Sequence, residues 1–241
     1  MLLSIIIPCR DEADSILETI NYITEELNNI SHELILINDF SKDNTLNILE
    51  EVSKSKNHIY TYNNNIKGLG GAIEIGIKKS TGIYTVIMMA DLSDNVSDLK
   101  KYIEIARKDE SLDAVFGSRF KKESRVYNYP LKKLFLNRLF NYFVKIIFFS
   151  NYNDFTNAFK LYKKTALLEL FPIVSENFNI FLELPLKIIS RGFKYQITSI
   201  SWNNRKKGKS KFNVKELSSK YFFTLAYCLM EKYLLKKKKL K

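Results

Sequence analysis

The chain has 241 residues, 46% of them hydrophobic, which is enough for a sizeable core in one large domain or one domain with a short appendage. Its net charge of +12 at pH 7 indicates an anionic partner, such as nucleic acid, anionic lipid or a phosphorylated substrate. The cysteines, Cys9 and Cys228, lack metal-ligand spacing and fit buried positions in a reduced compartment. The histidines, His32 and His58, stand apart, so neither a zinc enzyme nor a histidine-triad enzyme is expected.

Short apolar runs alternate with helical patterns through the first half of the chain. Strands are predicted at residues 2–7, 33–37, 58–62 and 84–91. Helices are predicted at about 16–27, 45–52, 68–79 and from residue 96 onward. This rhythm is typical of a parallel, doubly wound sheet, so the expected fold class is α/β with a mostly parallel central sheet.

Three of these strands lead into acidic loops, at Glu12, Asp39 and Asp91. The carboxyl ends of parallel strands meet at one edge of the sheet, where open α/β sheets bind their ligands. A purely structural sheet does not need carboxylates at that edge. We therefore expect these three side chains to share one crevice.

The run from Tyr84 to Asp94 carries the sharpest chemical signal. Asp91, Ser93 and Asp94 could hold a divalent cation through oxygen ligands, with nucleotide phosphates completing the shell. The structural alternative is that Ser93 or Asp94 caps a helix opening at Val96. Both interpretations remain open at this point.

The turn at Gly68-Leu-Gly70-Gly71 lacks the full G-x-G-x-x-G pattern and follows the third strand rather than the first. The plain interpretation, which we favour, is a tight turn into a helix. The alternative is that its backbone amides approach a nucleotide.

The second half begins with a short strand at 113–116, followed by Arg119, and a long apolar helix predicted at 131–149. Arg138, Asn141 and Lys145 form a narrow polar stripe on that helix. The helix could be core or lie in a membrane interface; the nearby lysines favour the interface, and its charges exclude a spanning helix.

The last third contains a helix from Phe181 that ends near Arg191 and an edge strand predicted at 195–202. A basic loop at 203–211 follows, which we interpret as a lid that brings cations to phosphate. An apolar helix is predicted at 217–235, with a basic tail that either binds anionic lipid or keeps the chain soluble. No recognition helix or RNA-binding signature accompanies these charges, so a nucleic-acid-binding module is not expected.

Two ordered motifs resemble the opening of the family 2 glycosyltransferases with the GT-A fold. Pro8-Cys-Arg10-Asp-Glu12 is similar to the family's P-x-x-N/D-E, and the run from Asn38 to Thr45 is similar to D-D-G-S-x-D-x-T. Shorter matches follow at 68–70, 90–93, 117–119, 154–160 and 205–211. Their order and spacing resemble the dolichyl- or polyprenyl-phosphate mannosyltransferase branch, from residue 4 to about residue 212.

The chain departs from the family pattern at several positions. Met89 replaces the first Asp of the D-A-D metal motif, and a thioether does not suit a hard cation. Asn38 and Phe40 replace the first Asp and the Gly of D-D-G-S, so Phe40 could reshape the pocket around the base. Lys133 stands where an Arg is expected, which loses bidentate phosphate binding. The family's T-S-G-F-K is Thr156-Asn-Ala-Phe-Lys here, which is bulkier.

The resemblance implies an inverting glycosyltransferase that moves a sugar from a nucleotide-diphospho-sugar to a polyprenyl phosphate. The implied donor-binding residues are Pro8, Arg10, Glu12, Asp39, Ser41, Gly68, Gly70, Ala90 and Asp91. The implied acceptor-phosphate residues are Lys133, Arg138, Arg205, Ser210 and Lys211. The implied catalytic residues are Asp91, which would orient the metal, and Arg119, which would help to clamp the phosphates. A divalent metal, Mg²⁺ or Mn²⁺, is implied on Asp91 with Ser93 and Asp94.

Two other functions stay open. A saccharide or glycolipid hydroxyl acceptor would need a carboxylate base, and Glu183 is the candidate, although it could equally be a helix-surface carboxylate. The missing Asp at position 89 also permits a catalytically weak nucleotide-sugar-binding protein.

We expect a glycosyltransferase domain at 1–212, with a donor half at about 1–120 and an acceptor half at about 121–212. The C-terminal helix and tail, 213–241, would form an appendage. No signal peptide is visible, so we expect a peripheral enzyme on the cytoplasmic face of the membrane, and a homo-oligomer is compatible with the sequence.

Overall fold

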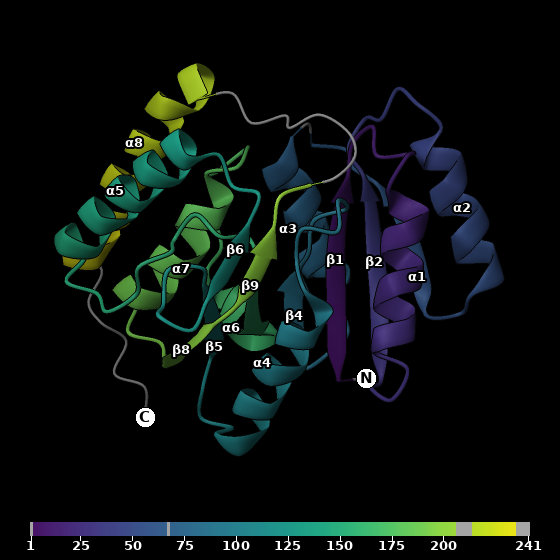
Figure 1. Cartoon of the computed structure of the whole chain (residues 1–241), viewed down its shortest axis with the longest axis horizontal. Coiled ribbons are helices and arrows are strands. Elements are labelled where there is room, and N and C mark those ends of the chain that lie inside the picture. Colours follow the sequence, from purple (N-terminus) through teal and green to yellow (C-terminus); the bar gives the residue numbers. More distant parts are fainter. Residues whose placement is uncertain (1, 67, 206–213, 235–241) are drawn as a thin grey trace.

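The computed structural model describes residues 2–66, 68–205 and 214–234, which form a three-layered α/β structure (Figure 1). The central sheet has seven strands in the order β3-β2-β1-β4-β7-β5-β8, and β6 and β9 form a second, two-stranded sheet. The strands are β1 Leu3–Cys9, β2 His32–Asn38, β3 Ile59–Asn63, β4 Tyr84–Ile87, β5 Ala114–Ser118, β6 Arg125–Tyr127, β7 Lys160–Lys163, β8 Tyr195–Ser199 and β9 Ser201–Asn203. The helices are α1 Ile16–Glu26, α2 Thr45–Ser55, α3 Leu69–Lys79, α4 Val96–Lys108, α5 Leu131–Ile147, α6 Lys164–Glu169, α7 Ile180–Ser190 and α8 Val214–Leu234.

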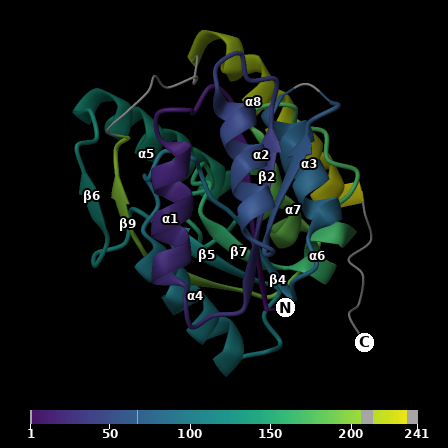
Figure 2. The ribbon, with the colours of Figure 1, turned by 90° about the vertical axis from the view of Figure 1, so that its right-hand side faces the viewer.

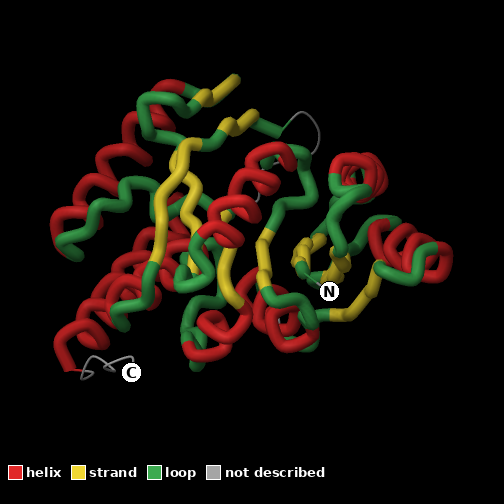
Figure 3. Tube along the Cα trace, turned by 90° about the horizontal axis from the view of Figure 1, so that it is seen from below, coloured by secondary structure: helices red, strands yellow, loops and turns green. Residues whose placement is uncertain are grey.

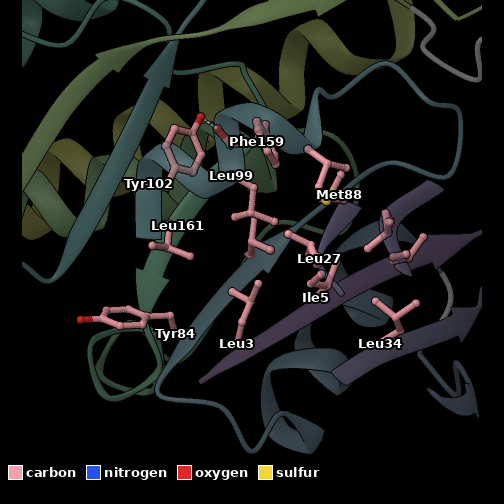
Figure 4. Packing of buried hydrophobic residues seen from close by; sticks show 14 of the residues in the cluster. Leu3, Ile5, Leu27, Leu34, Tyr84, Met88, Leu99, Tyr102, Phe159 and Leu161 are labelled. Carbon is pink, nitrogen blue, oxygen red and sulfur yellow. Dashed lines mark hydrogen bonds between the residues drawn. The ribbon is translucent and has the colours of Figure 1, made fainter. Parts of the chain in front are cut away.

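Helices cover both faces of the sheet because its strands are apolar on both faces. In β1, Leu3, Ile5 and Ile7 point into one hydrophobic cluster, whereas Ile6 points into the other. The first cluster contains side chains of α1, α2 and α4, and Figure 4 shows part of it. The second contains side chains of α3, α6 and α7. Figures 2 and 3 show the sheet between these two helical layers. The predicted α/β class with a mostly parallel sheet is confirmed.

Three details of the sheet differ from the sequence prediction. Strand β4 ends at Ile87, so residues 88–91 belong to the loop after it. The strand predicted at 195–202 is two strands: β8 is the edge of the main sheet, and β9 pairs with β6 after a break at Ile200. Strand β7 was not predicted, and it lies in the middle of the sheet, antiparallel to β4 and β5.

Helix α5 presents much of its apolar side to the outside and Asn141 of its polar stripe to the protein, whereas Arg138 is exposed. Asn141 is buried and bonded to Thr156 Oγ1 (3.1 Å), and Val144 beside it is buried too. The opposite side of the helix consists of exposed side chains, hereafter the α5 apolar face: Leu131, Phe135, Leu136, Leu139, Tyr142, Phe143 and Ile146. These residues recur at helical spacing on one side of the helix. Soluble proteins rarely expose contiguous apolar patches of this kind, and where they do, the patch usually marks a surface that binds a partner, a ligand or a membrane.

Helix α8 packs against both α7 and α5. Arg191, directly after α7, forms a bidentate ion pair with Glu231 (2.9 and 3.2 Å), and the ring of Phe140 in α5 contacts the ring of Tyr221. The C-terminal helix is therefore joined to the body of the protein. Among residues 2–66, 68–205 and 214–234, no helix combines the length and the apolar composition needed to traverse a lipid bilayer.

The two histidines are neighbours, contrary to the sequence interpretation. The rings of His32 and His58 lie edge to face with centroids 5.3 Å apart, because they precede or begin adjacent parallel strands. Most of the basic loop and all of the basic tail lie outside the described residues, and so do Ser210 and Lys211.

Candidate active site

The loops after β1, β2 and β4 lie together because these three strands are parallel neighbours. Glu12, Asp39 and Asp91 occupy these loops, at the edge that the sequence predicted. Pro8 lies within β1, and Ala90 is buried in the loop after β4, where its carbonyl accepts a hydrogen bond from Thr19 Oγ1 (3.1 Å).

The β1 and β2 loops are fastened to each other by hydrogen bonds. Asp39 N donates to Cys9 O (2.7 Å), and Asp11 N donates to Ser41 Oγ (3.1 Å). Lys42 N in turn donates to Asp11 Oδ1 (2.6 Å). These bonds fix the loops without any ligand.

Three residues other than glycine hold left-handed backbone conformations at this edge: Asp11 (φ 48°), Phe40 (φ 56°) and Leu92 (φ 58°). Each lies in the loop after one of the three strands. Such conformations cost free energy for L-residues with a Cβ, and they cluster at functional sites. The edge is therefore locally strained in all three loops.

Asp39 is held by the segment that leads into α3. Its Oδ1 accepts hydrogen bonds from Asn64 Nδ2 (2.7 Å) and Gly68 N (3.1 Å), and its Oδ2 lies 3.9 Å from Arg10 Nη1. Gly68 has φ 107°, which a residue with a Cβ rarely adopts. At Gly70 a Cβ would overlap the backbone of residue 175. Backbone geometry and close packing explain these glycines, and Gly68 reaches the site through Asp39.

Arg205, two residues after β9, bridges the loops that follow β1 and β4. Its guanidinium donates to Asp91 Oδ2 (2.7 and 3.0 Å) and to Glu12 Oε1 (3.3 Å). Burial raises the pKa of Glu12, although Arg205 opposes this shift. The structure thus brings together Glu12, Asp91 and Arg205, which the sequence assigned to donor and acceptor ends of the site.

Arg119 lies in a second, deeper ion pair. Its Nε and Nη2 donate to the two carboxylate oxygens of Asp154 (2.9 and 2.7 Å), and both side chains are buried. Burial alone would lower the pKa of Arg119, but the charge of Asp154 outweighs it and holds that pKa above its usual value. The guanidinium also lies over the ring of Trp202 in β9 (5.8 Å), and Arg205 follows that strand by two residues.

Lys133 and Arg138 complete a group of cations on this side of the site. The pKa of Lys133 is lowered by burial and by the charges of Arg119 and Arg205. Arg138 lies over the ring of Phe120 (5.3 Å), and Arg119 lies over the same ring (5.4 Å). Hereafter these four residues are the cation group: Arg119, Lys133, Arg138 and Arg205.

Glu183 does not join the site, and its contacts give it a structural role rather than that of a general base. It is fully buried in α7, where its carboxylate pairs with Lys187 Nζ (2.6 Å) and accepts hydrogen bonds from Val174 N (3.0 Å) and Ser175 N (2.7 Å). The sequence pattern could not tell which side of the helix this carboxylate faces.

The three residues predicted to hold a divalent cation have different surroundings. Asp94 is buried, and its Oδ2 accepts a hydrogen bond from Met89 N (3.2 Å); burial and the charge of Asp91 raise its pKa to about 7. The helix that follows is capped by Asn95, whose side chain accepts from Ser97 N (2.9 Å), not by Ser93 or Asp94. Ser93 N donates to Asp91 Oδ1 (3.1 Å).

Of the three predicted ligands, Asp91 is partly exposed, whereas Ser93 and Asp94 are buried. Within residues 2–66, 68–205 and 214–234, no three His, Cys, Asp or Glu side chains converge on a metal site. A single carboxylate still fits Mg²⁺, which is commonly held by one or two carboxylates with substrate phosphates and waters. The donor set therefore fits a cation that is shared with a bound diphosphate.

Two residues that fix the site were not singled out from the sequence. Asp154 lies within the 154–160 stretch that carries part of the family resemblance, which could have identified it. Asn64 binds Asp39, but it sits in a run of asparagines at 63–65 with no distinguishing signal.

Comparison with known proteins gives one family. The family model described as Glycosyl transferase family 2 matches residues 4–171. A dolichol-phosphate mannosyltransferase from Pyrococcus furiosus is 28% identical over 57% of the chain, and glycosyltransferase AglD from Haloferax volcanii is 26% identical over 83%. The dolichyl-phosphate beta-glucosyltransferase ALG5D from Trichomonas vaginalis is 27% identical over 81%. The matches span 39%, 32% and 63% of these relatives, so the chain corresponds to only part of each.

Solved structures share the fold. Glucosyl-3-phosphoglycerate synthase from Mycobacterium tuberculosis, in complex with uridine-diphosphate, superimposes with a TM-score of 0.71 at 13% identity, covering 95% of this chain and 80% of that one. A second structure of that enzyme, with a TM-score of 0.71 and 14% identity, holds Mn²⁺, uridine-diphosphate and phosphoglyceric acid and covers 95% and 78% of the two chains. The GT-A fold implied by the sequence resemblance is confirmed.

Proposed function

The chain belongs to glycosyl transferase family 2, and from this premise we propose that it transfers a sugar from a nucleotide-diphospho-sugar to a polyprenyl phosphate at a membrane surface. The family is shown by the match over residues 4–171; the transfer reaction, the lipid acceptor, the donor and the membrane location are the proposed parts. Relatives named for dolichol- and dolichyl-phosphate transfer support the acceptor, and structural neighbours that hold uridine-diphosphate support the donor.

The observation that carries the proposal is that the cation group meets an outward-facing apolar helix. Lys133 lies in the first turn of α5, where the α5 apolar face begins, and Arg138 of the same helix shares the ring of Phe120 with Arg119. A polyprenyl phosphate has an anionic head on a long apolar tail. The head would bind to the cations while the tail and its bilayer lie along the exposed side of α5.

The membrane surface is supported by the composition of that side of the protein. Exposed apolar side chains on α5 and α8, among them Phe143, Phe222 and Phe223, occur together with lysines such as Lys132. Apolar residues that enter a lipid interface beside cations that bind anionic headgroups are the usual features of a peripheral membrane helix. The cytoplasmic side and a homo-oligomeric state remain predictions.

The donor would bind across the strand ends. Asp39 and Glu12 would take the nucleoside, and the diphosphate would lie near Asp91 and Arg205. Arg205 would then exchange its carboxylate partners for phosphate oxygens. A divalent cation between Asp91 and the diphosphate would neutralise charge on the leaving nucleoside diphosphate.

The transfer itself needs little proton chemistry from the protein. An acceptor phosphate oxygen attacks the anomeric carbon and forms the new C–O bond, while the bond from that carbon to the donor diphosphate breaks and its electron pair leaves with the nucleoside diphosphate. The configuration inverts. A phosphate monoester, with a second pKa of about 6, is already largely ionised near neutral pH. The absence of Glu183 from the site is thus no obstacle, whereas a hydroxyl acceptor would need a base.

The test is a transfer assay with a panel of labelled nucleotide-sugars and a short-chain polyprenyl phosphate. We expect a butanol-extractable product that requires a divalent cation and is lost in Asp91→Ala but not in the control Asp14→Ala, an exposed Asp in the same set of loops. Glutamate at Leu139 and Phe143 should release the protein from anionic vesicles, whereas Ile83→Glu, at a side chain that is 56% exposed, should not. Intact donor binding without transfer to the lipid would contradict the lipid acceptor and favour a hydroxyl acceptor or a binding protein.

A further inference from the structure

We propose that Phe40 is the platform on which the nucleobase of the donor stacks. The inference rests on the proposed function, since it assumes a nucleotide donor at this edge. It adds a binding residue that the motif pattern does not supply, because the pattern has glycine at this position.

The ring of Phe40 is exposed and does not pack in either hydrophobic cluster, so it does not stabilise the fold. The side chain is 48% exposed and belongs to neither hydrophobic cluster. Within the described residues, no aromatic ring or cation is paired with it. A lone exposed apolar residue is ordinary in itself. The backbone that carries Phe40 makes this one unusual.

Phe40 holds a left-handed backbone conformation, with φ 56°. This conformation is a genuine outlier for a bulky residue, and only glycine adopts it without strain. Hydrogen bonds on both sides enforce it: Asp39 N donates to Cys9 O (2.7 Å), and Ser41 N donates to Asn38 Oδ1 (3.2 Å). The chain thus maintains strain at a position where the side chain does not contribute to packing, which points to a ligand.

The neighbours of Phe40 have the polarity that a nucleobase requires. Asp39 is buried next to it, with Oδ1 bonded to Asn64 and Gly68 and Oδ2 at 3.9 Å from Arg10, beyond hydrogen-bond length. An aromatic residue that directly follows, in the chain, a carboxylate lying 3.9 Å from an arginine suits a flat heterocycle, whose edge carries polar groups and whose faces are apolar. Because the loop is already fixed, little ordering is needed when the base binds.

The experiment is calorimetry of UDP, GDP and inorganic pyrophosphate, in Mg²⁺, with wild type and three variants. Phe40→Gly removes the ring and relieves the backbone. Phe40→Leu keeps apolar bulk without an aromatic face, and Phe40→Trp keeps the face. Phe149→Gly is the matched control, because Phe149 is another exposed Phe with positive φ (47°), beyond the end of α5.

We expect Phe40→Gly to weaken binding of the preferred nucleotide by about 5- to 100-fold, the range that loss of one base–aromatic stack produces. Pyrophosphate, which has no base, should bind equally to both proteins. The melting temperature should stay the same or rise, because glycine suits this backbone. Phe40→Leu should resemble Phe40→Gly, whereas Phe40→Trp and Phe149→Gly should resemble wild type.

Three other results would contradict the stacking of the base on Phe40 or the proposed function on which it rests. Equal nucleotide binding by wild type and Phe40→Gly would overturn the role of Phe40 and leave the proposed function intact. An equal loss for pyrophosphate and nucleotide would also overturn it, because the ring would then act on the diphosphate site. If wild type binds neither nucleotide, the proposed function fails first.

Discussion

Replacement of Glu183 tests whether its carboxylate stabilises the fold or acts as a general base. Its removal leaves Lys187 buried with two backbone carbonyls, of Leu170 and Pro172, and with Glu231 at 3.9 Å. It also takes the acceptor away from the amides of residues 174 and 175. Breaking a buried ion pair from one side destabilises a protein by about 3–5 kcal/mol. Because Lys187 keeps other partners, we expect Glu183→Ala to cost about 3 kcal/mol.

For a protein of this size, about 3 kcal/mol lowers the melting temperature by roughly 6–12 °C. Glu183→Gln should cost less, since its amide oxygen can still accept one backbone hydrogen bond. Glu176→Gln is the control, because Glu176 forms an exposed pair with Lys220 (3.2 Å) and such pairs contribute about 1 kcal/mol or less. The assay is thermal unfolding together with sugar transfer at a temperature where every variant is folded.

The expected result is a lower melting temperature with transfer per folded molecule close to wild type. A general base would behave in the opposite way: Glu183→Gln would lower turnover by about 10²- to 10⁴-fold without a change in melting temperature. That second pattern would refute the structural assignment and restore the hydroxyl acceptor.

Two further predictions concern the buried carboxyl group of Asp94 and the buried residue Gly117. Burial and the charge of Asp91 raise the pKa of Asp94 to about 7. The folded state therefore binds more protons than the unfolded state between about pH 4 and 7, and its stability falls as pH rises through that window. Asp94→Asn should raise the melting temperature at pH 8 more than at pH 4.5; equal shifts at both would contradict this. In Gly117→Ala the new Cβ would overlap Tyr102 Oη, which donates to Phe159 O (3.0 Å), so we expect a loss of about 2–4 kcal/mol in denaturant unfolding. Gly192→Ala, with open space around it but φ 78°, should cost about 1 kcal/mol; equal losses would argue against the overlap.

The first half of the fold could be predicted because β1, β2 and β4 are buried on both faces and consist of nearly continuous apolar runs. The same reasoning located the edge where Glu12, Asp39 and Asp91 meet, since parallel strands end together. Strand β7 was not predicted because it has only four residues and begins and ends with lysine, so it lacks the apolar pattern of a buried strand. Lys160 is buried there with hydrogen bonds to the carbonyls of residues 155 and 157, in the loop before the strand, and of residue 181 in α7, and this arrangement cannot be read from the sequence pattern.

Side-chain direction was the part that the sequence could not supply. Periodicity placed Glu183 on a helix but did not reveal that it faces Lys187 and the backbone of residues 174–175. On α5 the polar stripe was recognised, yet only the structure shows that this stripe faces inward at Asn141. The contact of His32 with His58 follows from the register of β2 and β3, which cannot be known before the sheet is assembled.

The bridge from Arg205 to Asp91 and Glu12 means that the resting site carries its own counter-ions. An incoming anion does not meet an uncompensated positive charge. It must compete with two carboxylates that belong to the same chain and are therefore present at high effective concentration. Chloride and other monovalent anions compete poorly under these terms, whereas a diphosphate brings several charges to one guanidinium at once. The arrangement selects ligands by charge density, so common cellular salts would not occupy the place of the substrate.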